Sequence, residues 1–394
     1  MAKELKELKD TSILMMGFDP NLLKKGIEVD AVARHQKYAS GLKRLDIIVF
    51  TRSKIKQNDI ADNCRIYNVG HGPAAIDRAL WLAKKLFRRH HYDIIDMQDP
   101  HVAGWVGYQL KKAYGRKYKT KLEVHFHGDF WNNKFWVKES WKNRIYNKLQ
   151  KKITKKADAI RVVNPLIKEK LVKSGISAKK IAIINTPVNE AAFVSGVVPE
   201  KIQAIHLMYG QKKILLFVGR FVKAKNLLFL IKIISQLKKQ RDDFVLLMIG
   251  QGDLQDTLTT AIKANGLEKT AFIIKPQSHL RLVAYYQAAY LNLLLSTNES
   301  FGKVIVEAGM AKTPSLASKT LGASAIIDDK HNGWLVDIND QNKTLEKLNY
   351  ILDHEDEAKR LGDNAYEIFL KKYGQQKAFA RVNEFWYKII NDLL

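Results

Sequence analysis

Short apolar runs alternate with amphipathic stretches along the whole chain of 394 residues. This alternation is typical of strands and helices that build mostly parallel sheets, and it excludes a helix bundle or a β-sandwich. We expect strands at 12–16, 46–50, 94–97, 121–126 and 159–163, and then at 214–218, 244–249, 271–274, 291–295, 314–317 and 333–336. The later runs are continuously apolar, as in parallel strands covered on both faces. The sequence therefore predicts an α/β protein with two Rossmann-like, doubly wound domains.

The pattern weakens between residues 186 and 209, where Pro187 and Pro199 interrupt it. A chain of this length also fits two domains of roughly 150–200 residues better than one. We therefore place an N-terminal domain at 1–195, a second domain at 196–374 and a terminal helix at 375–394. In doubly wound sheets, ligands bind beyond the carboxyl ends of the strands, so the loops there are where functional residues are expected.

The charge and the cysteine content limit the partners and the compartment. The formal net charge is +26, which attracts anionic partners such as phosphorylated substrates, lipid headgroups or nucleic acid. The single cysteine, Cys64, cannot form an intramolecular disulfide, so we expect the cytoplasm. No apolar run approaches the roughly 20 residues that span a bilayer. Any membrane contact is expected to be peripheral, on the inner face.

The stretch at residues 296–314, STNESFGKVIVEAGMAKTP, follows the buried run LNLLL. A loop with Glu299 leads into a helix near Lys303, and the start of a helix offers free N–H groups to an anion such as phosphate. Glu307 lies about one turn into the helix, so both carboxylates could reach one ligand and accept hydrogen bonds from sugar hydroxyls. The simpler alternative is that Glu299 only stabilises the helix start and Glu307 lies on a solvated face.

A second strand end carries Gly219, Arg220 and Lys225. The two cations could neutralise the charge that develops on a diphosphate as a sugar leaves, without a metal ion. The chain has no Asp-x-Asp pair after a strand and no His/Cys cluster with zinc-like spacing, so no metal and no cofactor are expected. In a chain this basic, however, Arg and Lys at a strand end would mean little by themselves.

Taken together, the motifs from about residue 213 to 372 resemble the donor domain of the GT4-type family of retaining glycosyltransferases, which have the GT-B fold. The family's Gly-Arg-x4-Lys, Gly-x-Gly and E-x-F-G-x4-E patterns match, in order, Gly219, Arg220, Lys225, Gly250, Gly252, Glu299, Phe301, Gly302 and Glu307. Pro314 and the later Asn332-Gly333-x-Leu-Val are also in register. Where the family often has Gly-Gly-x-x-Glu, this chain has Leu321-Gly322-Ala323-Ser324-Ala325.

The resemblance implies two domains that face each other across a cleft, with the terminal helix crossing back to the first. It implies that Arg220 and Lys225 bind the donor pyrophosphate, Glu299 the transferred sugar and Glu307 the ribose. The remaining donor-binding residues expected around them are Gly219, Gly250, Ser300, Phe301, Gly302 and Lys303. The donor, a UDP-, GDP- or ADP-sugar, is a substrate and not a cofactor.

The implied reaction is the transfer, with retention, of a hexose-type sugar to a glycan or lipid-linked acceptor, in cell-surface polysaccharide or glycolipid synthesis. Two other interpretations stay open. The charge alone would suit a nucleic-acid-binding protein, although the sequence contains no recognisable nucleic-acid module. The fold would also suit an epimerase or a phosphorylase.

The first half offers fewer motifs. His127, at the end of the run LEVHFHGDFW, matches the place where the family has a histidine at a strand end, and we expect it in the catalytic set with Glu299, Arg220 and Lys225. His125 is the rival, because it lies on the same strand face. On the acceptor side we also expect Gly17, Asp99 and Asp129.

Residues 134–156, which begin with Lys134 and end with Lys156, are heavily basic and contain several aromatic residues. Trp141, Ile145, Leu149 and Ile153 recur every four residues, so we expect them on the core side of a helix. The surrounding lysines and the tryptophans at the helix entry also suit an anionic membrane surface.

Overall fold

The computed structural model describes residues 5–24, 30–195 and 199–394, apart from the side chains of Asp30 and Phe135. It contains two compact units: unit 1 is Met1–Asn185 with Ala378–Leu394, and unit 2 is Thr186–Lys377. The predicted boundary after residue 195 adjoins residues 196–198, which lie outside the described residues. Residues 186–195 belong to unit 2 because Phe193 packs on His279 and Tyr286, with ring centroids 5.7 and 6.4 Å away.

Unit 1 has one eight-stranded sheet in the order β3-β4-β2-β1-β5-β6-β7-β8, parallel except for the pair β3 and β4. Its strands are β1 (Ser12–Gly17), β2 (Arg44–Val49), β3 (Gln57–Ala61), β4 (Cys64–Asn68), β5 (Ile94–Met97), β6 (Lys121–Phe126), β7 (Ala159–Val162) and β8 (Ile181–Ile183). The sequence missed β3, β4 and β8, because the β3 and β4 residues are largely polar and β8 has three residues. The strand order reverses between β1 and β5, which marks the switch point of this sheet.

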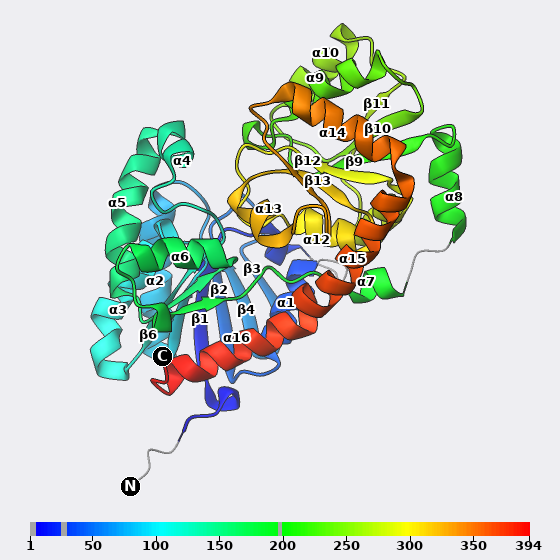
Figure 1. Cartoon of the computed structure of the whole chain (residues 1–394). Helices are drawn as coiled ribbons and strands as arrows, with labels where there is room; N and C mark the ends of the chain where they lie inside the picture. The colour runs from blue at the N-terminus through cyan, green and yellow to red at the C-terminus, as the bar shows by residue number, and fades with distance from the viewer. Residues whose placement is uncertain (1–4, 25–29, 196–198) are drawn as a thin grey trace. The chain divides into compact units, whose positions relative to one another are not determined.

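Helices cover both faces of the unit 1 sheet. Helices α1 (Asp30–Ala39) and α16 (Gln375–Ile390) share one face, where Tyr38 packs edge-on against Phe379 and Trp386. On the other face, helix α3 (Val102–Tyr118) contacts both α2 (Ala74–Arg89) and α5 (Trp141–Lys156) (Figure 1). The remaining helices of unit 1 are α4 (Lys134–Glu139) and α6 (Pro165–Lys173).

Unit 2 has a six-stranded, fully parallel sheet in the order β11-β10-β9-β12-β13-β14. Its strands are β9 (Lys213–Val218), β10 (Phe244–Ile249), β11 (Ala271–Ile274), β12 (Leu291–Leu294), β13 (Ser315–Ser318) and β14 (Trp334–Val336). The six runs predicted from the sequence fall on these six strands. The strand order reverses between β9 and β12, the second switch point.

The helices of unit 2 also form two layers (Figure 1). Helices α9 (Leu227–Lys238), α10 (Gln255–Ala264) and α14 (Gln341–Asp353) form one layer, and α8 (Pro199–Met208), α11 (His279–Ala288), α12 (Lys303–Met310) and α15 (Glu355–Tyr373) form the other. The short helices are α7 (Ala191–Val194) and α13 (Leu321–Ile326). Two doubly wound α/β units are thus confirmed. Among the described residues, no helix is long and apolar enough to cross a membrane.

Candidate active site

The carboxyl edge of unit 2 brings Lys225 and Glu299 together at its switch point. Lys225 follows β9, Glu299 follows β12, and Lys225 Nζ donates to Glu299 Oε2 in a short ion pair. The amide of Thr297 donates to the carbonyl of Ala224 over 2.9 Å, which ties the two loops together. The side chains of Lys225 and Glu299 are 18% and 17% exposed, so a ligand can still reach them. Arg220, two residues after the end of β9 and in the same loop as Lys225, is exposed.

Glycines allow the loops of this edge to approach closely. A Cβ on Gly250, after β10, would lie 1.9 Å from the carbonyl oxygen of Gly219. Gly302 has φ +85°, a left-handed conformation that favours glycine, and it directly precedes helix α12. No side chain of the described residues caps the start of α12, and the amide of Ile305 donates to the carbonyl of Gly302 over 2.9 Å. The glycines of the motifs therefore allow close contacts and turns of the backbone that a side chain would prevent.

Gly322 contributes to the same edge although the sequence comparison marked its segment as a departure. Its amide donates to the carbonyl of Glu299 over 2.7 Å, and a Cβ there would lie 2.6 Å from the amide nitrogen of Phe301. Phe301 is buried and packs edge-on against Tyr373, while Ser300 is half-buried. The first glycine of the family pattern is absent, but one glycine remains where the two loops touch.

Glu307 is buried on helix α12, so the alternative that it lies on a solvated face is wrong. Its Oε2 accepts a hydrogen bond from the hydroxyl of Tyr286 over 2.9 Å, and its Oε1 lies 3.2 Å from Lys303 Nζ. Burial, reinforced by the charge of Glu307, raises the pKa of Tyr286 well above its ordinary value. Tyr286 therefore stays a donor. No sequence motif contains Tyr286, and only the packing of α11 against α12 places it here.

The carboxyl edge of unit 1 gathers Gly17, Gln98 and His127 at the other switch point. Gly17 ends β1, and a Cβ there would lie 3.0 Å from Cβ of Gln98, which follows β5. His127 follows β6, is exposed, and has its Nε2 3.0 Å from Gln98 Oε1. Gln98 was not predicted, because a glutamine after a strand carries no recognisable signal of its own.

His125 occupies a different environment from His127. Its Nε2 lies 2.9 Å from Glu123 Oε1 and 3.0 Å from Asp96 Oδ1, and all three side chains are buried. Burial of the ring opposes its charge, but the two carboxylates outweigh this and raise the pKa of His125 to about 9. His125 is thus a buried cation, and only His127 lies at the edge of the sheet.

Asp96, Glu123 and His125 could also hold a metal ion, since their ligand atoms all lie within 4.8 Å of one another. The sequence spacing of these residues does not indicate a metal site, because Asp96 comes from β5 and the other two from β6. A proton and a metal ion compete for the same His125 Nε2, and the raised pKa of His125 favours the proton.

Asp99 and Asp129, the other two residues predicted on the acceptor side, form hydrogen bonds or ion pairs within unit 1. Asp99 accepts hydrogen bonds from the amides of His101, over 2.7 Å, and Ala103, over 3.1 Å, at the start of α3; burial raises its pKa to about 6. Asp129 is buried, 2.7 Å from Lys170 Nζ and 2.9 Å from Asn133 Nδ2. Contact of either carboxylate with an acceptor stays a prediction.

Helix α5 does not place the four predicted side chains in a core. Ile153 is buried and Leu149 half-buried, but Trp141 is 67% and Ile145 52% exposed. The second half of α5 packs closely on α3, where a Cβ on Gly104 would lie 3.4 Å from Ile153. The first half borders an apolar pocket of about 470 Å³, which Phe18, Phe50 and Ile76 also line. The expectation for Trp141 and Ile145 was wrong.

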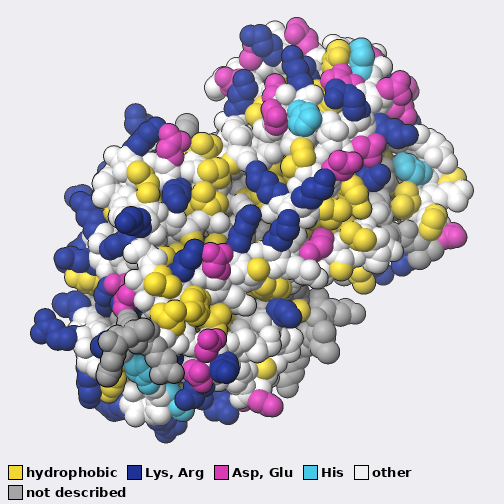
Figure 2. Space-filling model, turned by 60° about the horizontal axis from the view of Figure 1, so that its bottom comes forward, with side chains coloured by type: hydrophobic (Ala, Val, Ile, Leu, Met, Phe, Trp, Pro, Cys, Tyr) yellow, Lys and Arg dark blue, Asp and Glu magenta, His cyan; other side chains and the backbone are white. Residues whose placement is uncertain are grey.

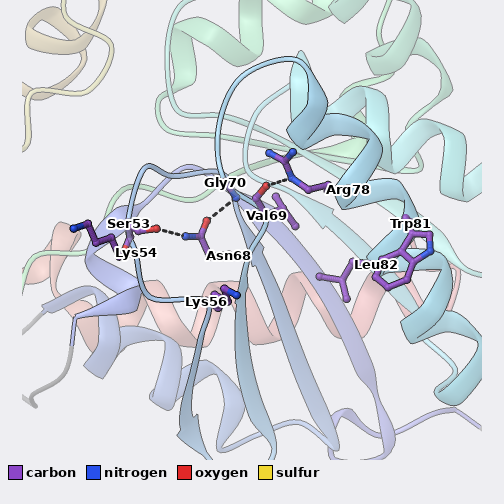
Figure 3. A pocket seen from close by; sticks show the side chains of 9 residues that line it. All are labelled: Ser53, Lys54, Lys56, Asn68, Val69, Gly70, Arg78, Trp81 and Leu82. Carbon is purple, nitrogen blue, oxygen red and sulfur yellow. Dashed lines mark hydrogen bonds between the residues drawn. The ribbon is translucent and has the colours of Figure 1, made fainter.

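A second pocket of unit 1, of about 460 Å³, lies between the end of β4 and helix α2 (Figure 3). Asn68 holds one wall, donating to the carbonyl of Ser53 over 2.8 Å and accepting from the amide of Gly70 over 2.9 Å. Arg78 Nε donates to the carbonyl of Val69 over 2.7 Å. Three of the lining side chains are cationic, none is acidic, and an exposed tryptophan forms part of the wall: Lys54, Lys56, Arg78 and Trp81.

Two family models match the chain. Glycosyltransferase Family 4 matches residues 20–192, and Glycosyl transferases group 1 matches residues 198–368. An uncharacterised glycosyltransferase of Methanocaldococcus jannaschii is 25% identical over 88% of this chain and 91% of its own length. A D-inositol 3-phosphate glycosyltransferase of Corynebacterium glutamicum is 31% identical over 39% of this chain and 38% of its own.

Solved structures match the fold over nearly the whole chain. The sucrose-phosphate synthase of Thermosynechococcus elongatus superposes with a TM-score of 0.81 at 19% identity, over 96% of this chain and 99% of that one. Anabaena HepE in complex with UDP and glucose gives 0.76 at 17% identity, over 95% and 99%. Both halves thus match glycosyltransferase models, and the second match includes most of the segment that carries the sequence motifs. The chain belongs to the GT4-type glycosyltransferase family and has the GT-B fold.

Proposed function

We propose that this glycosyltransferase moves a hexose-type sugar, with retention and without a metal ion, from a nucleotide-sugar to a glycan or lipid-linked acceptor. The observation that carries the proposal is the pairing of Lys225 with Glu299 at the switch point of unit 2, with the exposed Arg220 in the same loop as Lys225. One cation is already fixed by the carboxylate, and the other extends into solvent. The pair thus offers positive charge for a diphosphate and hydrogen-bond acceptors for a sugar within one site.

In this proposal, Arg220, Lys225 and the N-terminal end of α12 stabilise the negative charge of the departing nucleoside diphosphate. Glu299 accepts hydrogen bonds from hydroxyls of the transferred sugar, and its ion pair with Lys225 fixes its orientation. Glu307 binds the ribose hydroxyls, with Tyr286 holding one of its oxygens. The acceptor attacks on the face from which the diphosphate leaves, and its proton passes to the leaving phosphate.

The solved neighbour HepE, which binds UDP, glucose and UDP-glucose, makes UDP-sugars the first donors to test. Hydrolysis of UDP-, GDP- and ADP-sugars and transfer to candidate acceptors would be measured for the wild type and Glu299→Gln. We expect kcat to fall about 10²- to 10³-fold, as when a group that stabilises the transition state is removed. Glu169→Gln is the matched control, since Glu169 forms an exposed ion pair with Lys173 Nζ, 2.6 Å away, on α6.

Full activity of Glu299→Gln would refute the site. The anomeric configuration of the product tests retention, and unchanged rates in a chelator test metal independence. Product analysis also separates transfer from epimerisation and phosphorolysis. Binding of DNA or RNA without sugar-nucleotide binding would favour the nucleic-acid alternative, but the Lys and Arg side chains are spread over the visible surface of both units and form no single stripe (Figure 2).

The pocket in Figure 3 supports an acceptor that carries an anionic group, such as a phosphorylated glycan. Phosphate pairs with the cations, and a sugar ring can stack on the exposed face of Trp81. We expect Lys56→Gln to lower kcat/KM for a phosphorylated acceptor but not for its neutral analogue. Lys43→Gln, outside the pocket, is the control. Equal loss with both acceptors would contradict this use of the pocket.

The first half of α5 supports peripheral contact with an anionic membrane, on the inner face if the protein is cytoplasmic. Trp141 and Ile145 are exposed beside the exposed Lys142 and Lys148, so apolar and basic side chains face solvent together. We expect the protein to sediment with anionic vesicles but not with zwitterionic ones, and Trp141→Ala to weaken this binding. Trp81→Ala is the control, because Trp81 is 65% exposed and lies outside α5. An equal effect of both substitutions would contradict binding through α5.

A further inference from the structure

A row of polar side chains runs along one face of the unit 1 sheet and ends at His127. Strands β5 and β6 pair in parallel with Asp96 opposite Glu123. Because side chains alternate between faces, Asp96 on β5 lies on the same face as Glu123 and His125 on β6. Gln98 and His127, just after these strands, continue the row, since Gln98 contacts both Asp96 and His127. This is the face that α16 covers, so the row is buried except at the edge of the sheet.

The buried end of the row is held by charge. Trp386 Nε1 of α16 donates to Glu123 Oε2 over 2.9 Å, and Glu123 Oε1 lies 2.9 Å from His125 Nε2. The same nitrogen lies 3.0 Å from Asp96 Oδ1, so the imidazolium of His125 donates to two carboxylates. Arg161 stands opposite His125 on β7 and adds a second positive charge. The carboxylates are thereby fixed as hydrogen-bond acceptors.

The orientation of Gln98 follows from these contacts. Gln98 Nε2 lies 2.7 Å from Asp96 Oδ1, and an ionised carboxylate only accepts hydrogen bonds, so the amide must present its NH2 group to Asp96. The other end of the amide, Oε1, can only accept. It lies 3.0 Å from His127 Nε2, so the proton between them belongs to His127.

We propose that Gln98 is a positioning residue that holds His127 with its proton on Nε2, leaving Nδ1 as a hydrogen-bond acceptor at the carboxyl edge of unit 1. The centroid of the His125 ring lies 5.3 Å from that of His127, and the positive charge of His125 opposes a second one on His127. An acceptor nitrogen there suits a hydroxyl of the sugar or of its acceptor. This role in binding a hydroxyl rests on the proposed function, whereas the position of the His127 proton does not.

The tautomer is measured directly by NMR of the full chain with ¹⁵N-labelled histidine. We expect one neutral form of His127, with the proton on Nε2 and a bare Nδ1. Gln98→Met removes the acceptor, so the Nε2 proton should exchange faster with water and the ring shifts should change. Gln98→Glu replaces the amide oxygen with a carboxylate and should raise the pKa of His127 by about one unit or more.

Gln57→Met is the matched control, because Gln57 also donates to an aspartate two residues along its strand, Asp59, over 2.9 Å. It should leave the His127 resonances unchanged. The indole proton of Trp386 reports whether the buried end of the row survives each substitution. A neutral His127 with its proton on Nδ1, or a His127 spectrum unaffected by both Gln98 substitutions, would overturn the proposal.

Activity provides a second readout. We expect Gln98→Met to lower kcat/KM for transfer about tenfold, and to have little further effect in a His127→Ala background, because Gln98 acts through His127. Additive losses in the double variant would overturn the coupling. If no nucleotide-sugar is turned over at all, the proposed function fails while the NMR result still decides the tautomer.

Discussion

The carboxyl edges of the two sheets differ in how their residues are held in place. In unit 2, Arg220 and Lys225 lie in one short loop and Glu299, Gly302 and Glu307 in one loop and helix. In unit 1, the position of His127 depends on side chains from two strands and on a helix at the far end of the chain. A site whose residues are close in sequence can be predicted from motifs. A site that forms through contacts between distant segments cannot. The following predictions test this contrast.

The largest effect is expected from His125→Gln in unit 1. The substitution leaves Asp96 and Glu123 buried without the cation between them, and breaking a buried pair costs roughly 3–5 kcal/mol. Denaturant unfolding followed by tryptophan fluorescence reports mainly unit 1, which holds six of the seven tryptophans. His91→Gln is the control, since His91 lies 3.2 Å from Asp93 at the surface. Equal losses in the two variants would show that the buried row does not stabilise unit 1.

The same pair should make the stability of unit 1 depend on pH. The folded-state pKa of His125, about 9, lies above its ordinary value of 6.5, so protonated His125 favours the folded state. This contribution is complete below about pH 6.5 and is lost as the pH rises to about 9. The advantage of the wild type over His125→Gln should therefore narrow between pH 7 and pH 9. A constant difference over this range would mean that His125 is not charged in the folded protein.

In unit 2, Gly250→Ala should destabilise the edge by about 2–3 kcal/mol, because the added Cβ would lie 1.9 Å from the carbonyl oxygen of Gly219. Hydrogen exchange of peptides after β9 and β10 would measure the loss. Gly266→Ala is the control that measures the cost of a left-handed backbone without a steric clash. Gly266 has φ +63°, but nothing lies within 4 Å of the Cβ that would be added. It should cost about 1 kcal/mol. Similar protection in both variants would contradict the close approach of the two loops.

Tyr286→Phe should cost about 1–2 kcal/mol, because it leaves one oxygen of the buried Glu307 without its donor. If Glu307 binds the ribose, KM for the donor should rise while kcat changes little. Tyr290→Phe is the control, because it removes a hydrogen bond to the carbonyl of Ile351 and does not affect Glu307. A rise in KM in the Tyr290 variant as large as in the Tyr286 variant would argue against a specific role of the Tyr286–Glu307 pair.

The smallest effect on stability is expected from Ile145→Ser in α5. Because Ile145 is 52% exposed, the loss should stay within about 0.5 kcal/mol, whereas truncation of a core residue costs about 2–5 kcal/mol. Ile153→Ser, eight residues later on the same helix and fully buried, supplies the comparison. Similar losses of stability in both variants would mean that Ile145 faces the core as Ile153 does, as the four-residue periodicity predicted.

The sequence by itself determined the fold class and most of the unit 2 edge. Six short, continuous apolar runs were enough to indicate six buried parallel strands, since strands covered on both faces need apolar side chains on both. The residues next to Gly219 and Gly302 could be predicted because a loop between a strand and a helix places neighbours in sequence next to one another in space. The strands β3 and β8 were missed, because polar or very short edge strands leave no such pattern.

Tertiary structure alone decided the rest. Periodicity placed Trp141 and Ile153 on one side of α5, but whether a side chain is buried depends on what packs there. Ile153 lies against Gly104 of α3, whereas Trp141 is 67% exposed. Likewise, nothing in the sequence connects Trp386 with Glu123 or Gln98 with His127, because these contacts arise when β5, β6 and α16 meet. The directions of the hydrogen bonds also depend on the whole row of side chains. Asp96 orients the amide of Gln98, and Gln98 in turn determines which nitrogen of His127 carries the proton.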